Sequence, residues 1–363
     1  MPSRPRDGDG LQLKRAFRKG GDLMNYLTST AVALIAALTA GSAAMAQEHH
    51  FRFQSSDPAG NPNFELQHVF ADKVKELTNG EVTIELMPVG TIVDYKETPD
   101  AIQAGLIDGH ITDTSYFAGR DPAFGLIANP VGAWADPAQM IDFVENGGGK
   151  ELMNELINPY GLQFIGVSTP GLEAFVSKVP LDTVEDLKGV KVRSPEGLIA
   201  NVFAAAGANP VNLPSSEVYT SLDKGVIDAA DYSVFSVNQD TGMNDIAPHP
   251  VYPGFHSLPL VEVSMNKQKW DALTPELQAK ITEAQKIFQQ TQIDTLHQRD
   301  LEAVEAAKAG GKITVHDWSD EERAKFRGIA RGEWEKVAGQ SEMAQKVYDT
   351  LVTYLKDKGL MAE

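Results

Sequence analysis

Arginine is scarce in this sequence, and one arginine stands where it could hold an anion. Seven arginines follow residue 46, and Arg52, Arg120 and Arg193 are the three that precede the C-terminal region. Arg193 follows the apolar strand expected over 190–192, and strand ends line the cleft of an open α/β sheet. A guanidinium there can hold a carboxylate with two parallel hydrogen bonds, which lysine cannot. A surface arginine at a strand end is the equal alternative from spacing alone.

The chain lacks the motifs of common catalytic sites. It has no cysteine, which excludes thiol catalysis and zinc–thiolate sites. It contains no G-x-S-x-G, no H-E-x-x-H, and no G-x-G-x-x-G after a strand. Gly147 to Lys150 lacks the leading glycine of a phosphate-binding loop and is followed by Glu151, so it reads as a turn. We therefore expect a binding protein with no catalytic residues and no cofactor.

The charge balance excludes two classes of partner. Acidic groups outnumber basic ones 50 to 32, for a net charge of −18. Such a chain is repelled by nucleic-acid phosphates and by anionic membrane surfaces. The 363 residues, 42% of them hydrophobic, are enough for two lobes with sizeable cores.

Residues 1–46 read as a secretory signal peptide. Basic residues lie upstream of an apolar run over 30–40, and Ala44-Met45-Ala46 fits the small-residue cleavage pattern before Gln47. The apolar run is about half of the roughly 20 residues that a membrane span needs. Met24 is an alternative start to Met1. We expect export to the periplasm with cleavage after Ala46.

The mature chain alternates strands and helices, which predicts an α/β fold with mostly parallel sheets. A first lobe is expected mainly over 47–165, with strands around 51–53, 82–86 and 106–112 and helices over 63–77 and 98–105. A second lobe is expected mainly over 166–260, with strands over 162–167, 172–178, 190–193, 211–213 and 226–232 and helices over 197–206 and 215–224.

A short internal repeat links the two expected lobes. The segment 103–109 matches 223–229, and each copy has a glycine that ends a helix, Gly105 or Gly225, before an apolar pair and an aspartate. Two lobes of similar connectivity with a cleft between them are typical of binding proteins that close about a hinge.

The last hundred residues predict a strand returning to the first lobe, a long helix and two further helices, over 261–363. Thr274-Pro275-Glu276 is a cap with proline at the first helical position, and Gly310-Gly311 stops the helix. At 1.5 Å per residue the helix is roughly 50 Å long, enough to cross both lobes. Ser319 and Glu322 form a capping box that opens the next helix, and the last spans 343–358.

Two segments of the second lobe resemble a known family. Residues 183–195 contain the pattern D-L-x-G-x-K-x-R, with Arg193 as its arginine. Residues 207–214 contain G-A-x-P-x-x-L-P, and 217–230 resemble E-x-Y-x-A-L-Q-x-G-x-x-D. The sequence is similar to the substrate-binding subunits of TRAP (tripartite ATP-independent periplasmic) transporters, the DctP type, over nearly the whole mature chain.

This resemblance implies a fold, a function and partners. The fold would be two α/β lobes with a hinge, bridged by the long helix. The protein would capture a small organic anion and deliver it to the small and large integral membrane subunits of a TRAP transporter, as a monomer or homodimer. Arg193 would bind the substrate carboxylate, and Asp231 and Tyr232 match the site position after the G-x-x-D strand. A ligand-sensing subunit for a membrane receptor and a two-lobed enzyme are the alternatives.

The resemblance also implies further site residues. Tyr116, Phe255 and His256 lie in segments that face the cleft in this family, with core packing as the alternative, and Asn212 would donate or accept neutral hydrogen bonds.

The family also bears on a metal. The loop 252–257 resembles the P-G-W-x-E loop of the branch that binds 2-oxo acids, which often holds a cation. The three metal-contact positions here hold Gly171, Asp231 and Ser257. Asp231 is the only carboxylate among them, and a hard cation needs several oxygen ligands, so we expect no metal.

Overall fold

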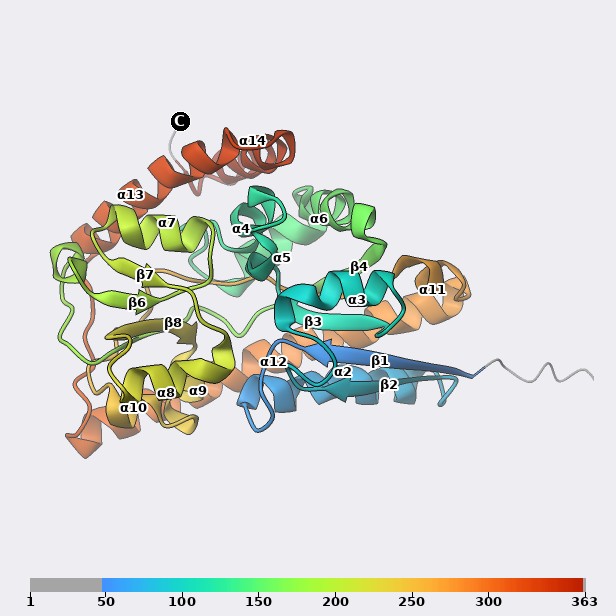
Figure 1. Ribbon diagram of the computed structural model, residues 1–363, viewed down its shortest axis with the longest axis horizontal. Helices are drawn as coiled ribbons and strands as arrows, with labels where there is room; N and C mark the ends of the chain where they lie inside the picture. The colour runs from blue at the N-terminus through green and yellow to red at the C-terminus, as the bar shows by residue number, and fades with distance from the viewer. Residues whose placement is uncertain (1–47, 362–363) are drawn as a thin grey trace, which may run out of the picture. The chain divides into compact units, whose positions relative to one another are not determined.

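Two β-sheets organise residues 48–361, the part of the chain that the computed structural model describes (Figure 1). The predicted signal peptide, 1–46, lies outside these residues. None of the described helices combines the length and the apolar composition needed to cross a bilayer.

The sheet of the first lobe has five strands in the order β2-β1-β3-β9-β4. They are β1 (His49–Ser55), β2 (Val82–Met87), β3 (Gly109–Asp113), β4 (Leu162–Ser168) and β9 (Val261–Asn266). β1 runs parallel to β2 and β3, but β9 runs antiparallel to β3 and β4. Four of the five strands therefore run in the same direction, as the sequence predicted, and β9, which enters this sheet from the other lobe, runs against them.

The sheet of the second lobe has four strands in the order β5-β8-β6-β7. They are β5 (Ala174–Ser177), β6 (Lys191–Arg193), β7 (Asn209–Val211) and β8 (Ala229–Ser233). β6 is parallel to β7 and β8, so Arg193 and Asp231 approach the same edge of this sheet. β7 begins and ends two residues before the predicted 211–213, because Leu213 has left the sheet and its carbonyl accepts a hydrogen bond from Arg193.

The long helix α12 (Pro275–Gly310) spans 36 residues and bridges the two lobes, as predicted. It packs against α2 (Pro62–Leu77) and β4 in the first lobe and against α9 (Phe235–Asp240) in the second. Its start is fixed as the sequence indicated, with the Thr274 side chain accepting a hydrogen bond from the amide of Leu277.

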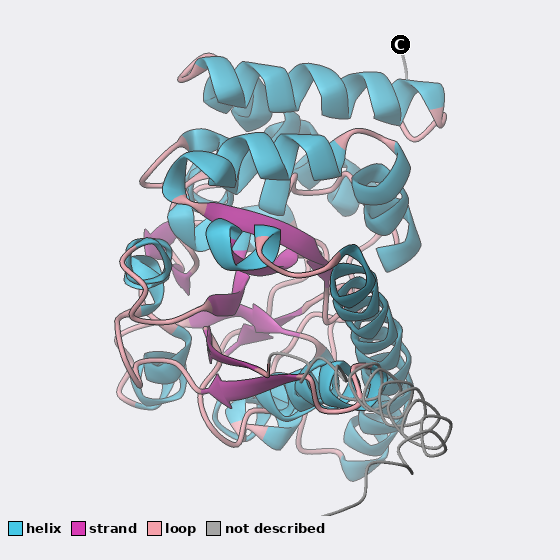
Figure 2. Ribbon diagram, turned by 90° about the vertical axis from the view of Figure 1, so that its right-hand side faces the viewer, coloured by secondary structure: helices cyan, strands magenta, loops and turns pink. Residues whose placement is uncertain are grey.

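The remaining helices cover the sheets and the junction between the lobes. They are α3 (Thr98–Gln103), α4 (Pro122–Ala128), α5 (Pro137–Asn146), α6 (Gly149–Ile157), α7 (Leu198–Ala205), α8 (Val218–Asp223), α10 (Met243–Ile246), α11 (Lys267–Asp271), α13 (Asp320–Ala338) and α14 (Glu342–Asp357). Short 3-10 helices span η1 (Tyr95–Glu97), η2 (Thr114–Phe117), η3 (Asn158–Tyr160), η4 (Val184–Leu187) and η5 (Ser215–Glu217). α13 and α14 pack on each other and on α4, and α13 also packs on α7, so they form an outer layer above the sheets (Figure 2).

The repeated segments adopt the same structure in both lobes. Gly105 and Gly225 follow α3 and α8 with φ values of 74° and 71°, a region that favours glycine. The isoleucine two residues on is fully buried in each copy. The aspartate after it accepts a hydrogen bond from the backbone of the neighbouring strand, Asp108 from Arg52 at 2.6 Å and Asp228 from Lys191 at 3.0 Å. Each copy thus fastens a helix end to the next strand.

Candidate functional site

Arg193 ends β6 and is only 2% exposed. Its guanidinium donates to two backbone carbonyls, from Nε to Leu213 at 3.0 Å and from Nη1 to Asp231 at 2.6 Å. Nη2 lies 3.5 Å from the hydroxyl of Tyr116. It forms no ion pair with any residue of 48–361. Burying a charge without a counter-ion is costly, so this guanidinium is held in place by the backbone with its charge left unpaired.

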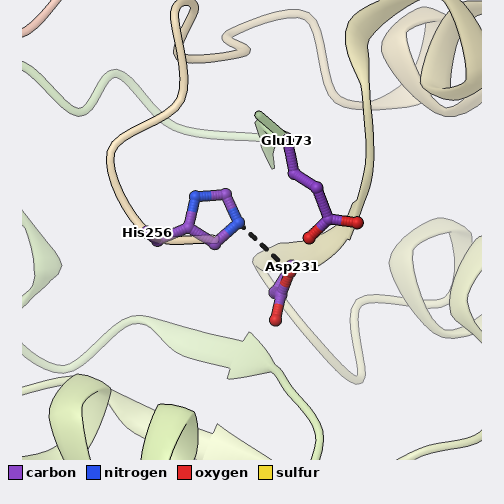
Figure 3. A group of neighbouring side chains, drawn as sticks. All are labelled: Glu173, Asp231 and His256. Atoms are coloured by element: carbon purple, nitrogen blue, oxygen red, sulfur yellow. Dashed lines mark hydrogen bonds and ion pairs between the residues drawn. The ribbon is translucent and has the colours of Figure 1, made fainter. Parts of the chain in front are cut away.

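The Asp231 carboxylate lies beside His256 and Glu173 (Figure 3). His256 Nε2 lies 3.1 Å from Asp231 Oδ1, and ligating atoms of all three residues lie within 4.8 Å of one another. Burial raises the pKa of Asp231, but the hydrogen bond and charge of His256 outweigh it, so the pKa is lowered. Burial and the Asp231 charge raise the pKa of Glu173 well above its usual value. Asp231 is therefore the carboxyl of this pair that ionises first, and Glu173 holds its proton to higher pH.

Glu173 corrects one expectation from the sequence. The expectation that Asp231 is the only carboxylate at this place was wrong, because Glu173 lies beside it. Gly171, which matches the family position, adopts a φ of 116° in the loop before β5 and lines a different cavity together with Val234. The turn at Gly171 lets the residue two places further on reach Asp231. A contact between Gly171 and a ligand stays a prediction.

The two predicted tyrosines lie close to Arg193 but come from different lobes. Tyr116 belongs to η2, and its ring packs edge-on against Tyr95 at 4.8 Å between centroids. Tyr232 lies in β8, and its hydroxyl accepts a hydrogen bond from Asn61 of the first lobe at 3.0 Å. Burial raises the pKa of both phenols, that of Tyr232 to about 12. Both hydroxyls stay protonated and can donate to an anion.

The other predicted site residues, Phe255, His256 and Asn212, make no hydrogen bond to Arg193. Phe255 is 7% exposed and stacks on Trp318 at 3.7 Å in a hydrophobic core, the arrangement that core packing would give. His256 is fully buried among aromatic rings, at 5.0 Å from Phe175, and reaches the site only through Asp231. Asn212 is exposed, and its side chain makes no hydrogen bond within 48–361. Ligand contacts by these residues stay predictions.

Two further carboxylates belong to this site and were missed. Asp57 follows β1 and accepts a hydrogen bond from Gln67 at 2.9 Å; Asp113 ends β3 and accepts one from the amide of Ser115 at 2.8 Å. Burial raises the pKa of each to about 6, and the charge of Asp231 adds to the rise for Asp113. The available signal was their position at the ends of parallel strands, the same signal that identified Arg193.

Direct contacts between the lobes enclose the site. Asn63 Nδ2 donates to Ser233 Oγ at 3.1 Å, and Ser215 Oγ donates to the carbonyl of Ser56 at 3.0 Å. An ion pair joins Lys96 to Glu196 at 2.8 Å. These polar contacts join side chains and backbone of opposite lobes, an arrangement suited to lobes that close on a ligand and part again.

The chemistry that this geometry supports is binding of an anion. The buried guanidinium of Arg193 lies beside the Tyr116 hydroxyl, and the Tyr232 hydroxyl is a further donor on the neighbouring strand β8. The histidine in contact with a site carboxylate, His256, is enclosed by aromatic rings. An imidazole so enclosed cannot deprotonate a nucleophile on a bound ligand, because a general base must reach the proton that it takes.

Comparisons with known proteins agree with this geometry. The family profile "Bacterial extracellular solute-binding protein, family 7" (DctP) matches residues 53–340. A monocarboxylate 2-oxoacid-binding periplasmic protein of Nostoc is 28% identical over 308 residues, 84% of each chain. The 2,3-diketo-L-gulonate-binding periplasmic protein of Escherichia coli is 29% identical over 271 residues, 70% of this chain and 76% of the relative.

Solved structures share the fold. A TRAP solute-binding protein from Bordetella bronchiseptica, with copurified calcium and picolinate, superposes with a TM-score of 0.77 at 21% identity, over 86% of this chain and 93% of that one. One from Colwellia psychrerythraea, with calcium and pyruvate, gives 0.76 at 23% identity, over 85% and 94%. The two-lobed fold and the family resemblance predicted from the sequence are confirmed. This chain belongs to the DctP family of bacterial extracellular solute-binding proteins.

Proposed function

We propose that this protein captures a small organic anion between its lobes, with Arg193 holding the acidic group, and delivers it to the membrane subunits of a TRAP transporter. The observation that carries the proposal is the guanidinium of Arg193, 2% exposed and without an ion pair within 48–361. A ligand carboxylate supplies the counter-ion that this buried charge lacks.

The ligand class follows from the donors around Arg193. Tyr116 and Tyr232 offer hydroxyl donors from opposite lobes, so a ligand with oxygens beyond its carboxylate can be held by both. The relatives named above bind 2-oxo acids, a diketo sugar acid, pyruvate and picolinate, all carboxylates of this size. We infer that the substrate is a 2-oxo or hydroxy acid, an aromatic carboxylate or a small sulfonate.

The residues present do not fit the hard cation that accompanies ligands in some relatives. Calcium takes six to eight oxygen ligands, roughly. Here Glu173 and Asp231 offer carboxylates, but the third member is the imidazole of His256, which suits softer metals. The hydroxyl of Ser257, in the position of a family glutamate, accepts a hydrogen bond from Asn129 at 2.9 Å. The Asp231 carboxylate and burial both raise the pKa of Glu173, which makes it a poorer ligand for a cation than an ionised carboxylate. No part of this proposal needs a metal.

A thermal-shift screen of organic acids identifies the ligand, because binding to the native state alone raises stability. Titration calorimetry on three variants then tests the role of Arg193. Arg193→Ala should weaken binding by roughly thirtyfold or more, since losing one partner of a buried charge pair costs about 2–5 kcal/mol. Arg193→Lys should recover only part of the affinity, because an ammonium lacks the planar fork.

Arg120→Ala is the matched control. The Arg120 guanidinium already binds both carboxylate oxygens of Asp100, at 2.9 and 2.6 Å, so its removal should leave ligand affinity unchanged. Near wild-type affinity in Arg193→Ala, or an equal loss in Arg120→Ala, would contradict the assignment.

Export is the remaining part of the proposal. The family is extracytoplasmic, and the pattern Ala44-Met45-Ala46 before Gln47 supports cleavage there. Mass spectrometry of periplasmic material should give a mature chain that begins at Gln47. A cytoplasmic protein that retains residues 1–46 would overturn this.

A further inference from the structure

A second cavity lies behind the loop that carries His256. Its volume is about 690 Å³, and α13, the loop 129–135 and the loop 253–258 line it. Phe255 and Ser257 face this cavity while His256, between them, contacts Asp231. Arg193 is not among its lining residues. The cavity is therefore separate from the site between the lobes.

Three arginines of α13 line this cavity. Arg323, Arg327 and Arg331 recur every four residues, which places them on one face of the helix. The Arg323 guanidinium already has partners within the protein. It donates to the carbonyls of Gly254 and Pro253 at 2.7 and 2.8 Å and pairs with Asp317 at 2.9 Å. Arg327 and Arg331, both half-buried, make no hydrogen bond or ion pair with any residue described in 48–361.

Two unpaired guanidiniums are notable in this sequence. Acidic groups outnumber basic ones 50 to 32, yet neither Arg327 nor Arg331 has found a carboxylate within the described chain. Like charges four residues apart on a helix destabilise it. A bound anion between them would remove that repulsion. Asp320, the other acidic residue of the lining, lies in the first turn of α13, two turns from Arg327.

The opposite wall provides an independent observation. Trp134 is 6% exposed and lines the same cavity, and its indole Nε1 has no acceptor among residues 48–361. A buried indole N–H usually has a hydrogen-bond partner. Gly132 of the same loop has a φ of 79°, and a Cβ there would lie 2.6 Å from Cγ of Arg327. The glycine thus lets the Arg327 side chain pass along the wall into the cavity.

We propose that this cavity is a second ligand site, for a small organic anion with an aromatic or apolar body. The acidic group binds Arg327 and Arg331 and accepts from the indole of Trp134. The body packs against the apolar walls formed by Trp318 and Leu258. A guanidinium pair with an indole donor and aromatic walls suits an aromatic carboxylate or sulfonate better than inorganic phosphate, which would leave the apolar walls unfilled.

Calorimetric titration of the full chain with naphthoate tests the proposal. Arg193→Ala serves as the background, so that binding between the lobes is suppressed. In this background naphthoate should still bind at one saturable site. Adding Arg327→Ala and Arg331→Ala should weaken that binding by about tenfold or more, because a hydrogen bond to a charged group contributes that much.

Two controls make the result decisive. Arg299→Ala in the same background removes an arginine of α12 that does not line the cavity and that pairs with Asp240 at 3.9 Å on the surface. This variant should change naphthoate affinity by less than about twofold, because an exposed ion pair contributes little. Naphthalenemethanol, which keeps the ring but not the charge, should bind at least about tenfold more weakly. Absence of saturable naphthoate binding in the Arg193→Ala background, or equal affinity in the Arg327/Arg331 and Arg299 variants, would overturn the proposal. Thermal unfolding of each variant checks that it is folded.

Discussion

Each lobe contains a buried histidine–carboxylate pair, and the two pairs differ in how fully their hydrogen bonds are made. In the first lobe, His110 Nε2 lies 2.6 Å from Glu262, and both side chains are fully buried. His110 Nδ1 pairs with Thr98 at 2.9 Å, and the second oxygen of Glu262 accepts from Thr114 at 3.0 Å. This network fastens β9 to β3 and leaves no ring nitrogen or carboxylate oxygen unpaired.

In the second lobe the corresponding network is incomplete. His256 Nε2 contacts Asp231 at 3.1 Å, but His256 Nδ1 is buried with no partner among the described residues. A second acid, Glu173, crowds the same carboxylate. Buried polar networks are stabilising when complete and costly when they are not. We infer that the first pair maintains the fold, whereas the second tolerates a cost because it sets the charge beside Arg193.

The largest effect should come from breaking the complete pair. Glu262→Ala leaves His110 and Thr114 buried without their partner, so the free energy of unfolding should fall by about 3–5 kcal/mol. Urea unfolding followed by circular dichroism measures it. Glu196→Ala, which removes the partly exposed ion pair with Lys96, is the control and should cost about 0–1 kcal/mol. A loss below about 1 kcal/mol in Glu262→Ala would mean that the first pair is no more important to the fold than a surface pair.

Changing the incomplete pair should affect ligand binding more than stability. Asp231→Asn keeps an acceptor for His256 but removes a negative charge near Arg193 and Glu173. Stability should change by less than about 1 kcal/mol, and affinity for an anionic ligand should rise by roughly threefold or more, because a repulsive charge is gone. Urea unfolding measures the change in stability, and titration calorimetry measures the change in affinity. Repeating the titration with a chelator should give the same affinity. If the chelator strongly weakened ligand binding by the wild type, and added calcium restored it, a cation would be present at Asp231.

The two missed carboxylates, Asp57 and Asp113, make the site between the lobes sensitive to pH. Burial raises the pKa of Asp57 and of Asp113 from 3.8 to about 6. Because the folded-state pKa lies above the unfolded one, the stability that each contributes is fully present below about pH 4 and is lost as pH rises through about 6. Asp57→Asn should therefore stabilise the ligand-free protein more at about pH 7.5, above that range, than at about pH 4.5, near its lower end.

Thermal unfolding of wild type and variant at both pH values gives that difference. Anion affinity of the wild type should also rise as the pH falls through about 6, since protonation removes the negative charge of Asp113 beside Arg193 and that of Asp57 beside the two site tyrosines. Equal stabilisation by Asp57→Asn at both pH values would show that Asp57 titrates normally.

The smallest effect should come from the rim between the lobes. The Lys96 and Glu196 side chains are 34% and 41% exposed, and an ion pair of this kind contributes about 0–1 kcal/mol. Lys96→Ala should therefore weaken ligand binding by less than about fivefold. Calorimetry against Arg193→Ala sets the scale. A loss as large as that of Arg193→Ala would place the binding energy at lobe closure instead of at the guanidinium.

Much of the fold could be predicted from the sequence because its signals are local. Periodic apolar residues, the Thr274 cap and the paired glycines at 105 and 225 act over a few residues, and the structure has helix and strand ends near each. The position of Arg193 at the end of a strand was also predictable from the apolar run before it. The family resemblance rests on the same contiguous segments.

Only the tertiary structure decided which side chains meet. His110 and Glu262 are 152 residues apart, and β9 brings them together only by entering the first sheet from the other lobe. Glu173 lies beside Asp231 after the loop turns at Gly171. Phe255 is buried in the core, where it stacks on Trp318. Local periodicity sets which face of an element is buried. The partners across that face depend on how distant strands and lobes pack, and no short-range pattern in the sequence encodes those distances.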